Sequence, residues 1–382
     1  MQIGVDASRI TRARRTGTEN YSLHVLRHLL ANDADNQYHL YLSADLAPGL
    51  LVLSPRTTTK VIRLPRLWTQ VGLSREMLGD PPDVLFVPSH VLPLVTPKRS
   101  VVVVYDVGHR FFPRAHAVFE WLYVEWAIRR HVRIATRMLT ISDASKRDLV
   151  RLYHADAARI DVAYPAVDAH FRPASAEDIQ RVEERYGLSQ PYVLHLGTIK
   201  PRKNLPRLVR AFAQADLPRG TQLALGGMTT SGSGAVEQAI RETGLEPRLR
   251  RLDYVPDQDL PALYSGATCV AIVSLYEGFG MPALEALACG APLLIGNRGS
   301  LPEIGADAAI VVDPLRIDDI ARGLERIVAD AALRQELRQN GLRRAAQFDW
   351  STAARVTRQA LERAFGPDGD RPFPSPPRSA AS

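Results

Sequence analysis

The sequence predicts an α/β protein with two Rossmann-like domains, and three observations support this fold class. The chain has 382 residues, which exceeds the ~100–200 residues of a typical single domain. Short β-rich runs alternate with helical patterns, which favours a parallel sheet covered by helices on both faces. The alternation pauses after Ala163 and restarts at Tyr192, so we expect two such sheets.

The first series predicts seven strands and several helices. Val101–Val104 is a continuous apolar run, as expected of a parallel strand buried on both faces. The helical pattern Asp143–Tyr153 follows Ser142, a residue type that caps helices. The expected strands are Gln2–Asp6, Tyr38–Leu42, Lys60–Arg63, Asp83–Phe86, Ser100–Tyr105, Thr136–Ile141 and Arg159–Ala163, and the other expected helices are Thr18–Leu30 and Ala117–Arg130.

The second series repeats the pattern, with Val270–Val273 as its most apolar run. The expected strands are Tyr192–Leu196, Gln222–Gly226, Leu249–Tyr254, Thr268–Ser274, Pro292–Gly296 and Ala308–Val312. The expected helices are Leu205–Ala215, Asp257–Tyr264, an Ala/Leu-rich helix from near Pro282, Ile317–Ala329 and Ala331–Gln347. A proline suits the first turn of the helix near Pro282, where its missing N–H leaves no bond unmade.

The pattern places the domains at residues 1–170 and 185–348. We expect the break within Val167–Ser189, where prolines and the charged stretch Glu177–Arg185 interrupt the alternation. A last helix is expected at Ser351–Phe365. Residues 366–382 are rich in Pro, Ser and charge, a composition typical of a disordered tail.

Composition limits the classes of function. The net charge of +7 suits an anionic ligand or membrane surface better than nucleic acid, because no nucleic-acid-binding motif is present; solubility alone explains it equally well. Cys269 and Cys289 lie in apolar surroundings and are expected to be buried and reduced. Neither a signal peptide nor a membrane-spanning run is evident, so we expect a cytoplasmic protein that binds a membrane at most from its surface.

The segment 274–285 predicts a site for an anionic ligand that carries hydroxyl groups. Gly278 and Gly280 stand between a buried strand and a helix, where they let the backbone approach a ligand. The helix N-terminus there favours a phosphate. Glu277 and Glu285 can accept hydrogen bonds from two separate points of a sugar nucleotide. A glutamate near a helix start is also a stabilising residue, so a structural role stays open.

A second cluster, Gly197–Asn204, also follows a strand and opens a helix. Its Arg202 and Lys203 have the charge to neutralise a diphosphate, arginine through a planar fork and lysine as a point charge. The alternative is a solvated basic turn. Two such clusters in one β/α series favour a shared ligand.

These clusters resemble motifs of the retaining GT-B glycosyltransferases of family 4, the glycosyltransferase group 1 type. The family motif is Glu, seven residues, Glu, which Glu277 and Glu285 match with GFGMPAL between them. Other matching segments are Gly197 with Pro201–Asn204, Tyr254–Pro256, Gly290–Pro292, Gly17–Asn20 and Thr140–Ser145. The resemblance covers nearly the whole chain except the tail and is more specific in the C-terminal half.

The resemblance implies two Rossmann-like domains that face each other across a cleft, with the donor in the C-terminal domain, the acceptor in the N-terminal domain and a last helix that crosses back. It implies that Glu277 holds the donor sugar, that Glu285 binds the ribose, and that Arg202 and Lys203 stabilise the departing diphosphate. Further donor contacts implied in the same way are the amides of Gly278, Phe279 and Gly280, a close loop approach at Gly17, and base packing near Tyr254 and Val255.

One position departs from the family pattern. Many members carry His-Asp at the end of an N-domain strand, and this chain has Tyr105-Asp106. We therefore expect Asp106, together with Glu277, to be catalytic. His109 and His90 are nearby in sequence and could replace the missing histidine in part, or be surface or packing residues.

The resemblance also implies a retaining reaction without a metal ion, in which the leaving diphosphate helps to deprotonate the acceptor. The protein then works by positioning and charge stabilisation. We expect no metal site and no cofactor besides the donor substrate, GDP-mannose first and a UDP-sugar second. Lys203→Ala or Glu277→Ala is expected to keep the fold and largely abolish transfer.

The acceptor is expected to be a saccharide or lipid-linked saccharide of cell-envelope or exopolysaccharide synthesis. The loop Ala7–Thr16, with Arg9, Arg12, Arg14 and Arg15, suits an anionic acceptor such as a lipid diphosphate. The basic stretch Arg129–Arg133 follows the aromatic helix Phe119–Trp126, and both could rest on an anionic membrane or form ordinary solvated surface.

Two other functions remain open from the sequence, a nucleotide-sugar epimerase of the same fold and a non-catalytic sugar-nucleotide binding protein. A nicotinamide dehydrogenase is disfavoured, because the segment Gly4-Val5-Asp6-Ala7-Ser8 gives no Gly-x-Gly-x-x-Gly motif after the first strand.

Overall fold

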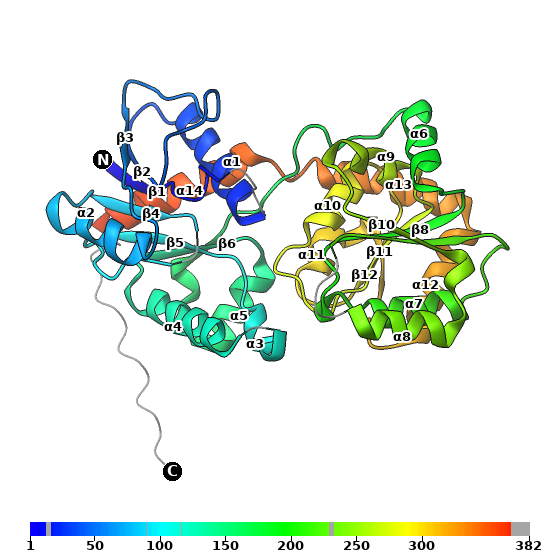
Figure 1. Cartoon of the computed structure of the whole chain (residues 1–382). Coiled ribbons are helices and arrows are strands. Elements are labelled where there is room, and N and C mark those ends of the chain that lie inside the picture. The colour runs from blue at the N-terminus through cyan, green and yellow to red at the C-terminus, as the bar shows by residue number, and fades with distance from the viewer. Residues whose placement is uncertain (13–16, 90, 116, 229–232, 368–382) are drawn as a thin grey trace, which may run out of the picture. The chain divides into compact units, whose positions relative to one another are not determined.

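The computed structural model describes residues 1–382 except 13–16, 90, 116, 229–232 and 368–382. Its contacts divide the chain into two compact units, each built on one sheet (Figure 1). The first unit comprises Met1–His109, His116–Pro165 and the chain from Trp350, and the second comprises Arg110–Ala115 and Ala166–Asp349. Residues 166–170, expected in the first domain, therefore pack with the second unit.

The first sheet has seven parallel strands in the order β3-β2-β1-β4-β5-β6-β7. The strands are β1 (Gln2–Asp6), β2 (Gln37–Leu42), β3 (Thr57–Val61), β4 (Val84–Val87), β5 (Ser100–Val104), β6 (Arg137–Thr140) and β7 (Ile160–Val162). The seven predicted strands are confirmed, although β3 starts at Thr57 rather than Lys60. This edge strand is half-buried or exposed, and its β-branched threonines supply the strand preference that an apolar pattern would otherwise show.

Helices cover the first sheet. They are α1 (Gly17–Asn32), α2 (Ser74–Gly79), α3 (Gly108–Phe111), α4 (Val118–Ile134), α5 (Asp143–Tyr153) and α14 (Trp350–Phe365), with the shorter turns η1 (Trp68–Leu73), η2 (Pro113–Ala115) and η3 (Ala157–Arg159). Ser142 caps α5 as predicted, because its side chain accepts the Ser145 N–H at 3.0 Å. The last helix, α14, packs on α1, and Trp350 stacks on His24 with ring centroids 4.7 Å apart.

The second sheet has six parallel strands in the order β10-β9-β8-β11-β12-β13. They are β8 (Tyr192–Leu196), β9 (Gln222–Gly226), β10 (Leu249–Asp253), β11 (Cys269–Ile272), β12 (Leu293–Gly296) and β13 (Ala309–Val312), which confirms the six predicted strands. The order reverses between β8 and β11, so the carboxyl ends of these two strands border a topological switch point.

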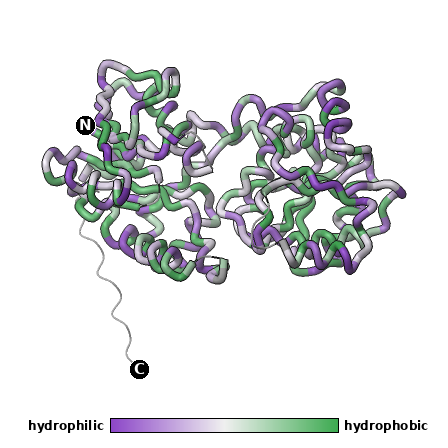
Figure 2. Tube along the Cα trace, viewed as in Figure 1, coloured by the Kyte–Doolittle hydropathy of each residue, from purple (hydrophilic) through white to green (hydrophobic). Residues whose placement is uncertain are grey.

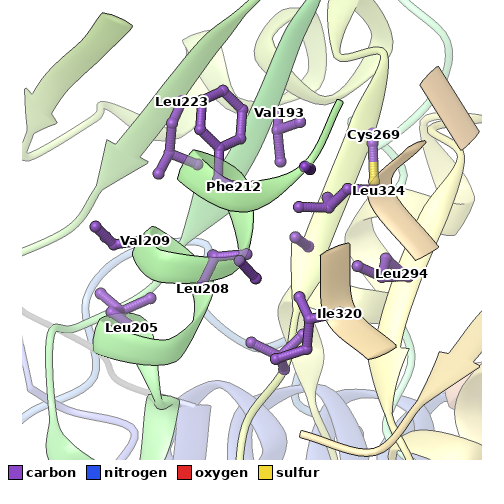
Figure 3. Close-up of a cluster of buried hydrophobic side chains, with 14 of the residues drawn as sticks. Val193, Leu205, Leu208, Val209, Phe212, Leu223, Cys269, Leu294, Ile320 and Leu324 are labelled. Atoms are coloured by element: carbon purple, nitrogen blue, oxygen red, sulfur yellow. The ribbon is translucent and has the colours of Figure 1, made fainter. Parts of the chain in front are cut away.

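The helices of the second unit bury amphipathic faces against this sheet. They are α6 (Ala176–Tyr186), α7 (Leu205–Gln214), α8 (Ser233–Thr243), α9 (Leu260–Gly266), α10 (Met281–Ala288), α11 (Leu301–Gly305), α12 (Ile317–Ala329) and α13 (Ala331–Ala345), with η4 (Pro201–Lys203), η5 (Glu246–Arg248), η6 (Asp257–Asp259) and η7 (Ala306–Ala308). In α7, Leu205, Leu208, Val209 and Phe212 recur at helical spacing and enter the core (Figure 3). In Figure 2 the hydrophobic colour follows the central strands of each unit.

The charged stretch Glu177–Arg185, interpreted from the sequence as an interruption, is the helix α6. Ser175 caps it by accepting the Asp178 N–H at 3.1 Å, and Gly187 ends it in the left-handed conformation. Only Val182 of this helix is buried, so the sequence carries almost no apolar periodicity there.

Both cysteines are buried and free, as predicted. Among the described residues, no helix combines the length and the hydropathy that crossing a membrane requires. The expected disordered tail lies outside the described residues from 368 onward.

Candidate active site

The two clusters predicted from the sequence meet at the carboxyl edge of the second sheet. Strands β8 and β11 pair in parallel, so the loops that follow them start side by side. The two loops are also bonded to each other, because the Leu275 N–H donates to the Arg202 carbonyl at 2.8 Å. The switch point of the sheet thus carries both clusters at one place.

The loop after β8 is held in a defined shape by Asn204. This residue has φ +61° and follows η4, and asparagine tolerates that left-handed conformation better than most residues. Its side-chain amide donates to the carbonyls of Val273 at 3.1 Å and Pro314 at 2.6 Å. These bonds fix the turn that carries Arg202 and Lys203.

The Glu277 carboxylate binds both cations of the neighbouring loop. Its Oε1 accepts from Lys203 Nζ and from Ser274 Oγ, each at 2.7 Å, and its Oε2 accepts from Arg202. Glu277 and Lys203 are each only 5% exposed. Burial alone would raise the pKa of Glu277, but Lys203 and Arg202 outweigh it and lower that pKa to about 2. Glu277 is therefore ionised and uses three of its roughly four acceptor positions on protein groups.

The loop between Glu277 and α10 is clamped by Ser300. The Ser300 hydroxyl is 3.1 Å from the Glu277 carbonyl and 2.5 Å from the Phe279 carbonyl. Gly299 permits this close packing, since a Cβ there would lie 2.7 Å from the Glu277 carbonyl oxygen. Gly280 precedes α10 with φ +101°, a conformation that glycine adopts without strain. The buried Phe279 ring meets Phe348 edge to face at 5.8 Å, so Phe279 offers a ligand only its backbone.

Glu285 lies one to two turns into α10 and has a different environment from Glu277. Its Oε2 accepts the Tyr264 hydroxyl at 2.8 Å. Burial raises its pKa to about 7, with Asp257 and Asp168 adding to the rise and the Tyr264 bond opposing it. Near neutral pH this site therefore holds one firmly ionised carboxylate and one carboxyl group poised to titrate.

Val255, the expected neighbour of the base, is 8% exposed, whereas Tyr254 before it is 67% exposed. They follow β10 in the same unit as both clusters. An exposed ring beside a buried valine offers a surface on which a planar base can pack.

His195 belongs to this region and was not predicted from the sequence. It is fully buried in β8, and its Nδ1–H donates to the Ala271 carbonyl at 2.9 Å. Burial and the nearby Lys203 lower the pKa of His195 to about 4, so the ring is neutral. Ser274, Ser300 and Tyr264 were also missed, because they act through hydrogen bonds that no spacing pattern records.

The charge balance defines what this edge can bind. Arg202 and Lys203 carry two positive charges, Glu277 carries one negative charge, and Glu285 is near its midpoint of titration at pH 7. Together with the N-terminus of α10, this leaves a positive field suited to a phosphate or diphosphate. A carboxylate partner also keeps the two cations in place before a ligand arrives.

The remaining predicted residues, Asp106 and Gly17, belong to the first unit. Asp106 is exposed after β5, and its Oδ1 accepts the Gly108 N–H at 2.7 Å. Gly17 starts α1, is exposed, and has open space where a Cβ would stand. Tyr105, in the position of the family histidine, donates its hydroxyl to the Pro88 carbonyl at 2.6 Å and thus anchors a neighbouring loop.

His90 and His109 were considered as substitutes for the family histidine. His90 lies outside the described residues. His109 is 4% exposed and part of a buried cluster, in which its Nε2 lies 3.1 Å from both Glu125 Oε2 and the Tyr153 hydroxyl. The structure therefore supports the packing interpretation of His109, because its polar edge is engaged by protein groups.

The basic stretch after α4's aromatic residues is largely engaged within the first unit. Arg130 donates to the carbonyls of Pro93 at 2.7 Å and Leu94 at 2.9 Å, and burial lowers its pKa. His131 is buried, and Arg129 pairs with Glu125 at 2.8 Å. These contacts weaken the expectation that the whole stretch is free to bind a membrane. Of the basic loop, Arg14 and Arg15 lie outside the described residues.

Comparisons with known proteins show which family this chain resembles. A family model described as glycosyl transferases group 1 matches residues 177–344. O-antigen chain mannosyltransferase B of Escherichia coli is 34% identical over 270 residues, which cover 69% of this chain and 70% of that protein. The serotype-specific mannosyltransferase WbdA of Escherichia coli is 30% identical over 237 residues, 60% of this chain but only 29% of WbdA. Anabaena HepE, solved in complex with UDP-glucose, matches with a TM-score of 0.70 at 19% identity over 94% of this chain and 98% of that one, which is a likeness of fold alone.

Proposed function

The chain belongs to the group 1 glycosyl transferases, and from this premise we propose that it transfers a hexose from a nucleotide-diphosphate donor to a saccharide acceptor in polysaccharide synthesis. Its two parallel-sheet units have the GT-B fold that the sequence predicted. The protein is thus a glycosyltransferase, and the proposal concerns its donor, acceptor and mechanism.

One observation carries the proposal, the pairing of buried Glu277 with buried Lys203 and half-buried Arg202 at the switch point of the second sheet. Two cations fixed by one carboxylate suit a departing diphosphate, whose charge increases as the glycosidic bond breaks. Removing one such contact is expected to cost ~2–4 kcal/mol of transition-state stabilisation. Glu277 still has an acceptor position for a sugar hydroxyl, and Glu285 is placed further along α10 for the ribose.

We propose a retaining mechanism in which the leaving diphosphate accepts the acceptor's proton on the same face. Arg202 and Lys203 supply the positive charge there, so we propose that transfer needs no metal ion. Asp106, exposed at the end of β5, is the proposed catalytic group of the first unit.

Mannose is the proposed sugar and GDP-mannose the proposed donor, supported by the mannosyltransferase names of the two Escherichia coli relatives. A UDP-sugar is the second choice, supported by the UDP-glucose complex of HepE.

A donor screen tests the proposal directly. We expect GDP-mannose to raise the melting temperature of the protein, because it binds only the folded state. With an oligomannoside acceptor, GDP release and product formation should follow, unaffected by EDTA, and NMR should show the α-anomer retained from the donor. Isomerised donor without acceptor would favour an epimerase, and binding without release of nucleotide would favour a non-catalytic protein.

A further inference from the structure

We propose that a pocket in the first unit binds the phosphate-bearing head of a lipid-linked saccharide, and that an exposed apolar stripe on α4 holds the lipid. This inference rests on the proposed transferase function and specifies its acceptor. It is carried by four features of the first unit: a pocket, its charge, its fixed polar and aromatic walls, and the stripe beside it.

The pocket lies where the first three strands end. It has a volume of about 660 Å³ and is lined by residues that follow β1, β2 and β3, among them Ser8, Ser43 and Arg63. Ligands of parallel α/β sheets bind beyond such carboxyl ends. The volume falls in the range of small-molecule sites.

The described lining of this pocket includes three arginines and no acidic residue. Arg9 and Arg12 both pair with the buried carboxylate of Glu19, at 3.7 and 3.5 Å, and Arg9 also lies close enough to the buried Asp6 carboxyl group to lower its pKa against the effect of burial. Arg12 shares Glu19 with Arg9, and its own side chain stays 55% exposed, so its guanidinium group can still reach an anion in the pocket. The third arginine, Arg63, pairs with Asp45 at 3.5 Å, but both side chains are 80% exposed, where water screens the pair. The pocket therefore keeps positive charge for an anion.

Two walls of the pocket suit a sugar next to that anion. The Trp68 indole N–H donates to the Ile62 carbonyl at 2.9 Å, which fixes the ring as an apolar platform. Gln70 donates to the Tyr123 hydroxyl at 3.2 Å, while its Oε1 is buried without a hydrogen-bond partner among the described residues. An acceptor left unpaired in this way costs ~1–3 kcal/mol unless a donor such as a ligand hydroxyl or a bridging water reaches it.

The apolar stripe lies on α4, the teal helix in Figure 1, which also contributes Tyr123 to the lining of the pocket. Phe119, Leu122 and Trp126 are 81%, 54% and 41% exposed. Tyr123, which lines the pocket, completes their i, i+3, i+4, i+7 stripe. The opposite face of α4 is buried through Glu125, Ile128 and His131, so the stripe faces away from the core of the first unit.

The positively charged pocket and the apolar stripe beside it together indicate the class of ligand. A free anionic saccharide would need the arginines but not four exposed apolar side chains beside them. An amphiphile with a phosphate or diphosphate between sugar and lipid uses both. The lipid part would lie on the stripe, as an apolar helix face lies on a membrane interface.

Titration calorimetry on the full chain tests this with farnesyl diphosphate, inorganic pyrophosphate and farnesol as probes. Saturating GDP is present throughout, so that the donor site is occupied. We expect farnesyl diphosphate to bind at least ~10-fold more tightly than pyrophosphate, a difference of about 1.4 kcal/mol that the lipid contacts would supply. Farnesol alone should bind more weakly than farnesyl diphosphate, because it lacks the charge.

Matched variants separate the parts of the site. Arg12→Glu should weaken both phosphate probes by ~10-fold or more, whereas Arg219→Glu on the exposed surface of the second unit should not. Phe119→Ser with Leu122→Ser should bring farnesyl diphosphate down to the affinity of pyrophosphate. Leu78→Ser, 72% exposed on α2, is the control for loss of surface hydrophobicity. Unchanged melting temperatures establish that each variant is folded.

The outcomes are distinct. Equal affinities of farnesyl diphosphate and pyrophosphate in the parent protein would overturn the lipid part, and unchanged phosphate binding in Arg12→Glu would overturn the pocket. If the stripe variant instead alters the oligomeric state and leaves farnesyl diphosphate binding intact, the stripe is a protein interface. Loss of donor binding and nucleotide release would refute the proposed function, while intact donor chemistry with no farnesyl diphosphate binding would refute this inference alone.

Discussion

Glu277 has a role in the structure that its motif does not reveal. The resemblance assigned it to the donor sugar, and the structure uses most of its hydrogen-bonding capacity on Lys203, Arg202 and Ser274. The expectation that Lys203→Ala or Glu277→Ala leaves the fold intact therefore needs revision. Breaking a buried ion pair leaves one uncompensated charge, which typically costs several kcal/mol.

We predict that Glu277→Gln and Lys203→Met each lower the free energy of unfolding of the second unit by about 3–5 kcal/mol. The double variant should lose less than the sum, because neither charge of the pair is then left alone. All three should release nucleotide at least ~100-fold more slowly than the parent protein. Urea denaturation followed by circular dichroism measures the first effect, and coupled detection of GDP measures the second.

The double variant is also the control for the activity result. A folded double variant without transfer separates the chemical role of the pair from its structural one. Additive losses of stability would show instead that Glu277 and Lys203 do not interact across the two loops.

The raised pKa of Glu285 predicts that the stability of the protein changes with pH in a defined direction. Its pKa is about 7 in the folded protein against 4.5 for a free side chain, so the folded state binds more protons between these values. The free energy of unfolding then falls as pH rises from 4.5 to 7. The shift corresponds to at most about 3 kcal/mol.

Glu285→Gln removes this titration, so we predict that the variant gains stability relative to the parent between pH 4.5 and 7 and keeps that gain above pH 7. Thermal melts of both proteins from pH 4.5 to 8 measure it. Parallel curves over that range would mean that Glu285 titrates normally.

At the scale of elements, the sequence predicts those helices and strands whose residues form a regular apolar pattern. The central strands were found because their residues are buried on both faces, as in Cys269–Ile272, whereas the exposed edge strand β3 was found from its β-branched threonines. Helix α6 was missed because solvent covers nearly all of it, leaving no apolar stripe to detect. Its signal was local instead, a Ser175 cap with Glu177 and Asp178 in the first turn and Gly187 at the end. The Glu277–Lys203 contact depends on the pairing of β8 with β11, which no local pattern specifies.

The Ser175 cap allows a test of how helix α6 is stabilised. We predict that Ser175→Ala lowers the free energy of unfolding of the second unit by ~1 kcal/mol, since the Asp178 N–H loses its acceptor at the start of α6. Ser175→Asp should retain the stability, because aspartate caps equally well. Urea denaturation of both variants measures the difference. Equal losses in the two would show that the serine acts other than as a cap.

At the scale of the whole molecule, each unit has its own sheet and core, and α14 returns the end of the chain to the first unit. All four tryptophans, Trp68, Trp121, Trp126 and Trp350, belong to the first unit. The donor clusters belong to the second. Tryptophan fluorescence therefore reports on the unit that does not hold the donor clusters.

Because the tryptophans and the donor clusters belong to different units, we can predict how each unit responds to a mutation and to the donor. Leu361 of α14 is fully buried, so Leu361→Ala should destabilise the first unit by about 2–5 kcal/mol and lower the fluorescence-detected transition. Circular dichroism follows both units, so the second unit is seen as the part of that transition which tryptophan fluorescence does not follow. GDP-mannose should raise this part equally in parent and variant, because ligand binding stabilises only the unit that binds it. If the sugar nucleotide raised the fluorescence transition by as much as the circular-dichroism transition, the two units would unfold as one cooperative block, and donor binding would stabilise the acceptor-side unit as well.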